Sequence, residues 1–371
     1  MRSLNKTNLA FFSLLRAGLW EQSVRLLPYE PLDFDALYRL AEEQSVVGLV
    51  AAGLEHVEDW KVSKQEALPF MKNVFSTESR NASMNRFIGE LITRMREAGI
   101  YALLVKGQGV AQCYTRPQWR SSGDIDFIFD DENYAIAKEF MIPLAISLDA
   151  ENGQHISMTV DSWVVELHGN MNCGLSVRMD SVIQDVQDAI FRCGNVRVWK
   201  DGETDVFLPD PDNDVIFIFT HFLKHFYKGG IGLRQICDWC RLLWTYSESI
   251  DRELLENRLC SMGLMSEWRA FAVFAVECLG MPEESMPLYI PSYKWKRKAL
   301  RIKSFIMKVG NFGHNRDMSY YKKYPYLVRK TISLGRRFGD LCRHALIFPL
   351  DSLRFFPTIL KNGVRSALKG V

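Results

Sequence analysis

The sequence contains no hydrophobic run long enough to cross a membrane, no internal repeat and no low-complexity segment. Its N-terminal apolar stretch, residues 9–15, ends at Arg16, far short of the roughly 18 residues that a spanning helix needs. No small-residue cleavage site follows, so we expect an amphipathic helix there and not a signal peptide. Cysteine is scarce and scattered, with eight residues in 371, which excludes a disulfide-rich scaffold. We therefore expect reduced thiols and a cytoplasmic protein.

The formal net charge is only +2, but the charge is distributed unevenly along the chain. Residues 291–371 contain 19 Lys and Arg against three Asp and Glu, whereas the first 290 residues contain 27 against 41. This asymmetry predicts an anionic partner for the basic C-terminal region, or packing of that region against the acidic body. Lys and Arg alternate with Leu and Phe at helical spacing, which is typical of a helix on an anionic membrane surface. We therefore also expect that the protein is peripheral to a membrane.

Nucleic acid is a less favoured partner of the basic region, because no recognisable nucleic-acid motif is present. A group of tyrosines interleaved with lysines could nevertheless stack on bases. The group consists of Tyr320, Tyr321, Tyr324 and Tyr326 with Lys322 and Lys323.

The length of 371 residues predicts two or three domains, and hydrophobic periodicity predicts a mixed fold. Residues 1–85 show apolar residues at helical spacing, and residues 81–98 form an amphipathic pattern that ends at Gly99. Strands are indicated by short or alternating apolar runs at residues 101–105, 124–129, 155–160 and 163–168. Only Asp161 and Ser162 separate the last two runs, which predicts a hairpin. The pattern is helical again from Asp214 to Gly280, so the fold class is α+β.

Asp124 and Asp126 form the most informative motif. Two carboxylates at positions i and i+2 of a strand point to the same face. Charges of one sign so close together are unfavourable unless a cation lies between them. Mg²⁺ is bound through one or two carboxylates together with substrate phosphates, so the pair favours metal-assisted phosphoryl or nucleotidyl transfer. The alternative is a solvated strand edge.

The neighbouring segments contain the other groups that such chemistry needs. The predicted strand 101–105 leads into Lys106, Gly107 and a helix, whose first N–H groups can receive phosphate oxygens. Lys106 and Arg120 can neutralise phosphate charge. Glu166 lies on a later predicted strand and can add a third carboxylate to the Asp pair.

The segments LLVKGQGVAQCY, RSSGDIDFIF and VVELHGN resemble the polymerase-β-type nucleotidyltransferase superfamily, and more narrowly its uncharacterised bacterial branch. The resemblance spans roughly residues 30–245 and includes further residues, namely Tyr114, His221, Arg234 and Asp238. It implies a polymerase-β-like core, which is a small mixed sheet with helices, flanked by N- and C-terminal helical segments. The implied divisions are a helical segment at 1–85, the core at 86–210, a helical domain at 211–290 and a basic helical region at 291–371.

The resemblance implies Mg²⁺-dependent transfer of a nucleotidyl group from an NTP to an acceptor hydroxyl, with release of pyrophosphate. Asp124, Asp126 and Glu166 would hold the metal and carry the catalysis. The nucleotide would be bound by Lys106, Gly107, Gln108, Arg120, His168 and Arg234. Gln108 is a departure, because many superfamily members have Ser or Gly at this position of the turn.

A small molecule or a glycan precursor is the favoured acceptor. One alternative is a catalytically retired scaffold that binds an anionic membrane surface through residues 291–371. Another is a nucleotidyltransferase that modifies protein or RNA. The base preference and the oligomeric state do not follow from the sequence.

Several other side chains have competing interpretations. His155 and His168 either contact substrate or form structural hydrogen bonds, and Tyr114 is expected to pack. Arg234 and Asp238 at i and i+4 predict a helix ion pair, with a phosphate contact of Arg234 as the alternative. A zinc site with four ligands is conceivable, namely His221, His225, Cys237 and Cys240. It is disfavoured, because the two cysteines fall in an apolar helical pattern, where cysteine packs as a small apolar residue. Residues 229–232 are expected to connect two helices.

Overall fold

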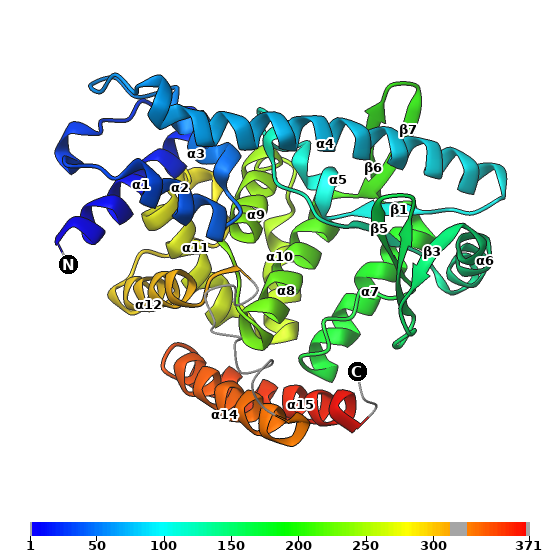
Figure 1. Cartoon of the computed structure of the whole chain (residues 1–371). Coiled ribbons are helices and arrows are strands. Elements are labelled where there is room, and N and C mark those ends of the chain that lie inside the picture. The colour runs from blue at the N-terminus through cyan, green and yellow to red at the C-terminus, as the bar shows by residue number, and fades with distance from the viewer. Residues whose placement is uncertain (1, 312–324, 369–371) are drawn as a thin grey trace.

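The structure is a computed structural model, and it describes residues 2–311 and 325–368 (Figure 1). It combines a small mixed sheet with many helices, which confirms the predicted α+β class. The division into four domains stays a prediction. All eight cysteines are free thiols, as expected. Among the described residues, the helices are too short or too polar to cross a membrane.

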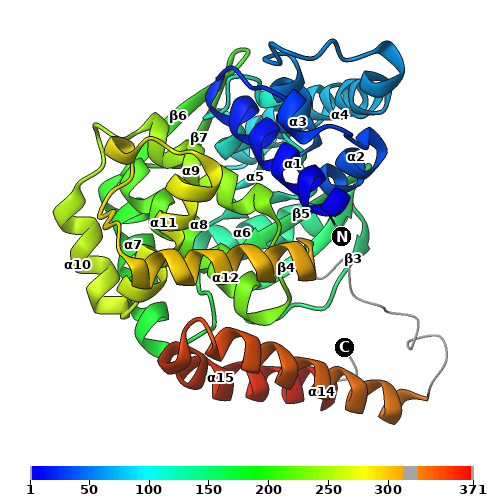
Figure 2. The ribbon, with the colours of Figure 1, turned by 90° about the vertical axis from the view of Figure 1, so that its left-hand side faces the viewer.

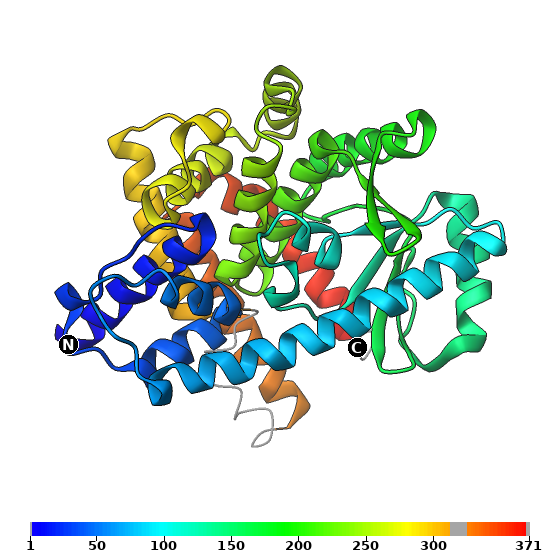
Figure 3. The same cartoon turned by 90° about the horizontal axis from the view of Figure 1, so that it is seen from above.

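The N-terminal helices are α1 (Arg2–Trp20), α2 (Phe34–Glu43), α3 (Val47–Leu54) and α4 (Lys64–Glu97). Helices α1 and α3 approach closely because glycines lie at their crossing: a Cβ on Gly53 would be 2.0 Å from the carbonyl oxygen of Leu14. The sequence predicted a helix at residues 81–98, whereas α4 has 34 residues. It begins 17 residues earlier because Ser63 and Glu66 form a reciprocal capping box. Figure 3 shows α4 running from the N-terminal helices to the sheet.

The main sheet has the strand order β1-β2-β5-β4-β3. Its strands are β1 (Leu103–Val105), β2 (Ile125–Ile128), β3 (Ala145–Leu148), β4 (His155–Val160) and β5 (Trp163–His168). Strands β2 and β5 are parallel, and the other pairs are antiparallel. The predicted hairpin of β4 and β5 is confirmed, and it turns at Asp161 with a φ of 52°. The parallel pair matters for function, because it places β2 beside β5, which begins 35 residues after β2 ends.

The remaining elements of the central region cover and extend this sheet. They are α5 (Gly107–Ala111), α6 (Asp131–Met141), α7 (Val177–Cys193) and the two-stranded sheet of β6 (Val196–Asp201) and β7 (Thr204–Pro209). A buried cluster joins α4 and α6 to the sheet through Met84, Ile88, Phe127, Tyr134 and Leu167. Short 3₁₀ turns occur at Leu27–Tyr29, Pro117–Trp119, Ile142–Leu144 and Glu283–Ser285.

The C-terminal half is helical, as predicted from residue 214 onward. It comprises α8 (Pro211–Lys228), α9 (Leu233–Thr245), α10 (Arg252–Met262), α11 (Met265–Leu279), α12 (Tyr293–Val309), α14 (Tyr326–Ala345) and α15 (Pro349–Leu368). Buried aromatic side chains form its centre, where the ring of Phe219 lies 4.9 Å from that of Trp268 and 5.5 Å from that of Trp239. Helices α14 and α15 lie side by side below α12 (Figure 2). We call these two helices the C-terminal hairpin.

Of the tyrosine-lysine group, residues 320–324 lie outside the described residues, and Tyr326 begins α14. Contact of this group with nucleic acid stays a prediction from the sequence.

Candidate functional site

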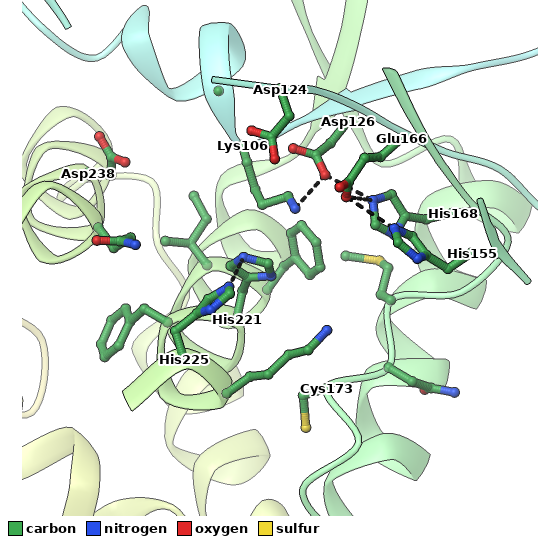
Figure 4. A pocket seen from close by; sticks show the side chains of 18 of the residues that line it. Lys106, Asp124, Asp126, His155, Glu166, His168, Cys173, His221, His225 and Asp238 are labelled. Carbon is green, nitrogen blue, oxygen red and sulfur yellow. Dashed lines mark hydrogen bonds and ion pairs between the residues drawn. The ribbon is translucent and has the colours of Figure 1, made fainter. Parts of the chain in front are cut away.

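A cleft of about 580 Å³ separates the main sheet from α8 and α9. One wall is formed by residues of β2, β4, β5 and the turn after β1, and it carries the acidic groups. The opposite wall is one face of α8, which carries lysine and histidine side chains. Figure 4 shows the two walls facing each other, with Asp126 and Glu166 on one side and His221 and His225 on the other.

The sheet brings the three predicted carboxylates together. Asp126 of β2 and Glu166 of β5 are direct partners in the parallel register, and Asp124 lies immediately before β2. One oxygen of each of these carboxylates lies within 4.8 Å of the others. Asp126 is 3% exposed, Glu166 is half-buried and Asp124 is exposed, so the group opens from the sheet toward the cleft. The Asp124–Asp126 pair is therefore joined by the third carboxylate that the sequence suggested.

Lys106 is held against these carboxylates by an unusual backbone conformation. Its φ of 57° and ψ of −143° are strained for a residue with a side chain, at a cost of about 1–3 kcal/mol. Its ammonium Nζ lies 2.5 Å from Oδ1 of Asp126. The turn thus positions a cation at the most buried carboxylate of the cleft.

Two histidines contact the same carboxylates. Nε2 of His168 lies 2.9 Å from Oδ1 of Asp126 and 3.3 Å from Oε2 of Glu166. Nε2 of His155 lies 3.1 Å from Oε2 of Glu166. Both rings come from strands of the main sheet, so their positions are fixed by the strand register. The structure places both histidines inside the candidate site.

The charged neighbours change the pKa values of the three carboxylates in different directions. The charge of Asp126 and loss of hydration raise the pKa of Asp124. Burial opposes ionisation of Asp126, but the Lys106 ammonium and the hydrogen bond from His168 lower its pKa. Burial likewise opposes ionisation of Glu166, and hydrogen bonds from the two histidines lower its pKa. Asp126 and Glu166 are therefore kept ionised beside the carboxylate of Asp124. Their negative charges at short separation favour the binding of a cation.

The opposite wall contains residues that the sequence analysis missed, Lys224 and Lys228 of α8. They share a helix face with His221 and His225, whose Nε2 atoms lie 3.0 Å apart. Burial and nearby lysines lower the pKa of His221 and lower that of His225 to about 3, so both imidazoles are neutral. The repeated four-residue spacing of Lys and His along one helix was the available signal. Only contact with the sheet shows that this face borders the cleft.

Arg120 lines the cleft, as its predicted role requires, but its guanidinium is already paired with a carboxylate. Its guanidinium forms two hydrogen bonds of 2.7 and 2.8 Å to the carboxylate of Asp238 on α9, and both side chains are buried. The hydroxyl of Tyr114 donates a further hydrogen bond of 2.8 Å to Asp238. Arg120 therefore links the loop before β2 to α9, and a phosphate would have to compete with a buried ion pair for it.

The predicted helix ion pair of Arg234 and Asp238 is wrong, because Asp238 is engaged by Arg120. Arg234 instead donates a hydrogen bond of 2.9 Å to the carbonyl of Ser121, and its buried Nε has no hydrogen-bond partner among the described residues. Burial and the charge of Arg120 lower the pKa of Arg234. No described carboxylate forms an ion pair with this guanidinium, although the charges of Asp238 and Asp124 act on it. It lines the cleft, as the alternative interpretation, a phosphate contact, requires.

The turn after β1 only partly fits its predicted role. Gly107 lines the cleft with a φ of 36°. The side chain of Gln108 faces away from the cleft: it is 2% exposed and donates a hydrogen bond of 2.9 Å to Oδ1 of Asn81 on α4. The helix that follows, α5, has five residues and hence only a weak dipole for phosphate binding. The turn therefore acts mainly by placing Lys106.

The disfavoured zinc site does not form among the described residues. Cys237 and Cys240 are fully buried in the apolar face of α9, whereas His221 and His225 face the cleft from α8. Within the described ranges, two groups have ligand atoms close enough together for one ion, and both lie at the main sheet. They are Asp124, Asp126 and Glu166, and His155, Glu166 and His168.

The arrangement places hard oxygen ligands on one wall and cations on the other. Carboxylate oxygens at this separation suit Mg²⁺, and the lysines across the cleft suit an anionic, phosphate-bearing ligand. A volume of about 580 Å³ is within the range of small-molecule sites.

Comparison with known proteins gave one family match. A family model described as uncharacterised nucleotidyltransferase matches residues 30–280. The crystal structure of an antigenic nucleotidyltransferase-like protein from Paracoccidioides brasiliensis is similar over 53% of this chain and 92% of that one, with 12% identity and a TM-score of 0.33. No curated protein matches the chain.

Proposed function

The chain belongs to the family of uncharacterised nucleotidyltransferases, and on this premise we propose that it transfers a nucleotidyl group from an NTP to an acceptor hydroxyl. The observation that carries the proposal is the group of Asp124, Asp126 and Glu166, whose oxygens gather within 4.8 Å of one another in a cleft lined with cations. In this reaction the acceptor oxygen bonds to the α-phosphorus, the bond to pyrophosphate breaks, and the hydroxyl loses its proton to solvent.

The three carboxylates fit Mg²⁺, because they offer several oxygen ligands on one side of an open cleft. Asp124, Asp126 and Glu166 would hold the ion, which neutralises phosphate charge and polarises the phosphoryl oxygens when it is bound. Lys106 keeps the buried carboxylate of Asp126 ionised by its contact of 2.5 Å. This contact orders the site before a nucleotide arrives.

The cationic groups of the cleft would bind the triphosphate. Lys224 and Lys228 line the cleft from α8, and Arg234 adds a guanidinium whose Nε has no partner in the part of the chain that the structure describes. Lysines act as point charges toward phosphate, and arginine adds directed N–H donors. Gln108 and Arg120 are left out of this group, because one faces α4 and the other is paired with Asp238.

We infer a small acceptor, a free small molecule or a glycan precursor. A cleft of about 580 Å³ holds an NTP with room for only a limited further group. Two rival functions follow from the same fold: modification of protein or RNA, and a scaffold whose catalytic site is no longer used. The three ionisable carboxylates favour an active site over a retired one.

Calorimetric titration with each of the four NTPs, with Mg²⁺ and with a chelator, tests the proposal. We expect at least one NTP to bind only when Mg²⁺ is present. Asp126→Asn keeps the side-chain volume and removes an anionic ligand, so it should abolish this binding. Asp161→Asn makes the same charge change at the exposed hairpin turn and should bind as the parent does. Failure of the parent to bind any NTP would favour the scaffold function.

A second candidate function concerns the C-terminal hairpin, which we propose binds an anionic membrane surface. Leu346, Leu350 and Leu353 are 66%, 78% and 68% exposed, and their spacing places them on one face of α15 and the turn before it. They belong to a region with 19 basic and three acidic residues. Exposed leucines in a basic helical region are typical of a helix that lies in the membrane interface.

A further inference from the structure

We propose that His155, Glu166 and His168 form a second divalent-metal position, which takes a borderline cation of the Mn²⁺ to Zn²⁺ series in preference to Mg²⁺. The position shares Glu166 with the carboxylate group, but it needs no nucleotide and does not rest on nucleotidyl transfer. The geometry of the sheet, the separation of the ligand atoms and the chemistry of the ligands each support it.

The strand register places the three side chains on one face of the sheet. His155 of β4 and His168 of β5 are direct partners in the antiparallel pairing, and their rings lie with centroids 4.6 Å apart. Glu166 precedes His168 by two residues, so it points to the same side of β5. Ligands that stand on paired strands are held more rigidly than ligands on loops.

The separations of the ligand atoms match those around one ion. Nε2 of His155 and Nε2 of His168 lie 3.1 and 3.3 Å from the same oxygen, Oε2 of Glu166. Ligands that bind a metal at about 2.0–2.2 Å with angles near 90–110° are themselves about 3.0–3.5 Å apart. The atoms of the group all lie within 4.8 Å of one another. His155 is the most accessible ligand, with a side chain 41% exposed at the cleft, so an ion can enter from solvent.

The ligand types decide which ions fit. Imidazole nitrogen suits Fe²⁺, Ni²⁺, Cu²⁺ and Zn²⁺, whereas Mg²⁺ prefers oxygen ligands. Mn²⁺ is the weakest binder of the transition-metal series and serves here as the spectroscopic probe. Two imidazoles with one carboxylate therefore select a different ion from the one that Asp124 and Asp126 select. Because Glu166 belongs to both groups, it can bridge two ions through its two oxygens.

A purely structural role for the histidines makes a different prediction. In that case, His155 and His168 only donate hydrogen bonds that hold the carboxylates in place, and His168 does this for Asp126 as well, at 2.9 Å. A ring nitrogen that binds a metal carries no proton, so ligation and donation are mutually exclusive at Nε2. A measurement of direct nitrogen ligation separates the two roles.

The test uses the full chain with stoichiometric Mn²⁺ and no nucleotide. Electron spin-echo envelope modulation detects ¹⁴N nuclei that are bound directly to Mn²⁺. We expect such coupling in the parent, weaker coupling in His155→Gln, and none in the double variant His155→Gln/His168→Gln. His56→Gln removes an imidazole outside the cleft and should retain the parent spectrum. Calorimetry should show at least about a tenfold loss of Mn²⁺ affinity in the double variant.

Two results would overturn the second metal position: Mn²⁺ bound by the parent through oxygen alone, or a nitrogen coupling that survives in the double variant. The single variant His155→Gln, at an exposed side chain, keeps the test valid if the double variant does not fold. Circular dichroism establishes folding in each case. Because no nucleotide is present, failure here is distinct from failure of Mg²⁺-dependent NTP binding.

Discussion

Asp126 shows at the scale of one residue how the site is constructed. A carboxylate that is only 3% exposed is costly unless it is paired, and the ammonium of Lys106 and the ring of His168 both contact it. The sequence identified Asp126 through its alternation with Asp124 and apolar neighbours, because that pattern is local. It also identified Lys106 and Glu166, since each belongs to a recognisable strand or turn.

The role of Arg120 was not predictable in the same way. Its partner Asp238 lies 118 residues away on α9, and no local pattern records such a contact. From the sequence, Arg120 was expected to bind phosphate and Asp238 to pair with Arg234. The structure instead pairs Arg120 with Asp238. A buried ion pair between distant elements is seen only when the tertiary fold is known.

The buried pair of Arg120 and Asp238 leads to a prediction about stability. Asp238→Asn leaves the guanidinium of Arg120 buried without a counter-ion and should lower the free energy of unfolding by about 3–5 kcal/mol. Urea unfolding followed by circular dichroism measures this loss. Asp161→Asn at the exposed turn should change the value by no more than about 0.5 kcal/mol. A loss in Asp238→Asn as small as in this control would show that the pair does not stabilise the fold.

Helix α8 shows what can be predicted at the scale of an element. Its apolar periodicity predicted a helix, and Phe219, Phe222 and Phe226 indeed pack in the core. The opposite face, which carries Lys224 and Lys228, borders the cleft. The sequence alone does not distinguish such a face from a solvated one, because lysines are common on both. The helical pattern of residues 1–85 includes the first half of α4, but the sequence did not show that this half and residues 81–98 form one continuous helix.

The packing of α11 against α8 and α15 gives a prediction about pH. Glu267 of α11 is fully buried; burial and the charge of Asp351 on α15 raise its pKa to about 8, although Tyr227 of α8 donates a hydrogen bond of 2.8 Å. As the pH rises, Glu267 loses its proton near pH 4.5 in the unfolded chain and only near pH 8 in the folded chain. The contribution of Glu267 to stability is therefore fully present below pH 4.5 and is lost progressively as the pH rises toward 8.

Glu267→Gln mimics the protonated side chain and tests this dependence. The parent should lose up to about 1.4 kcal/mol of unfolding free energy per pH unit between roughly pH 5 and 8. The variant should show a flatter profile and exceed the parent in stability at pH 8. Urea midpoints measured across this range provide the comparison. Identical slopes in the two proteins would mean that Glu267 does not titrate at this helix interface.

At the scale of the whole molecule, the sequence predicted the α+β class and the family but not the arrangement of its parts. The helical, strand and hairpin patterns are local, and they place the carboxylates on neighbouring strands once β2 pairs with β5. The position of α8 across the cleft depends on tertiary packing between segments that are far apart in the chain. The acidic body and basic C-terminal region were visible from composition, whereas the exposed leucines on the hairpin required the structure.

The C-terminal hairpin should bind anionic vesicles in a salt-dependent manner. We expect the protein to sediment with vesicles of phosphatidylserine and phosphatidylcholine at low ionic strength and to be released at high ionic strength. Leu350→Ser with Leu353→Ser should weaken the binding, because it removes apolar area from the interface. Leu68→Ser, at a leucine of α4 that is 64% exposed, is the matched control. Equal binding to phosphatidylcholine alone, or no binding to the mixture, would contradict membrane attachment.

The most direct test of the central claim is the affinity of the full chain for an NTP in the presence of Mg²⁺, measured in the parent and in Asp126→Asn. The account predicts Mg²⁺-dependent binding to the parent and to Asp161→Asn, with a loss of at least about a hundredfold in Asp126→Asn, which is about 2.7 kcal/mol. Equal affinity of the parent and Asp126→Asn would contradict the assignment of the cleft as a metal-dependent nucleotide site.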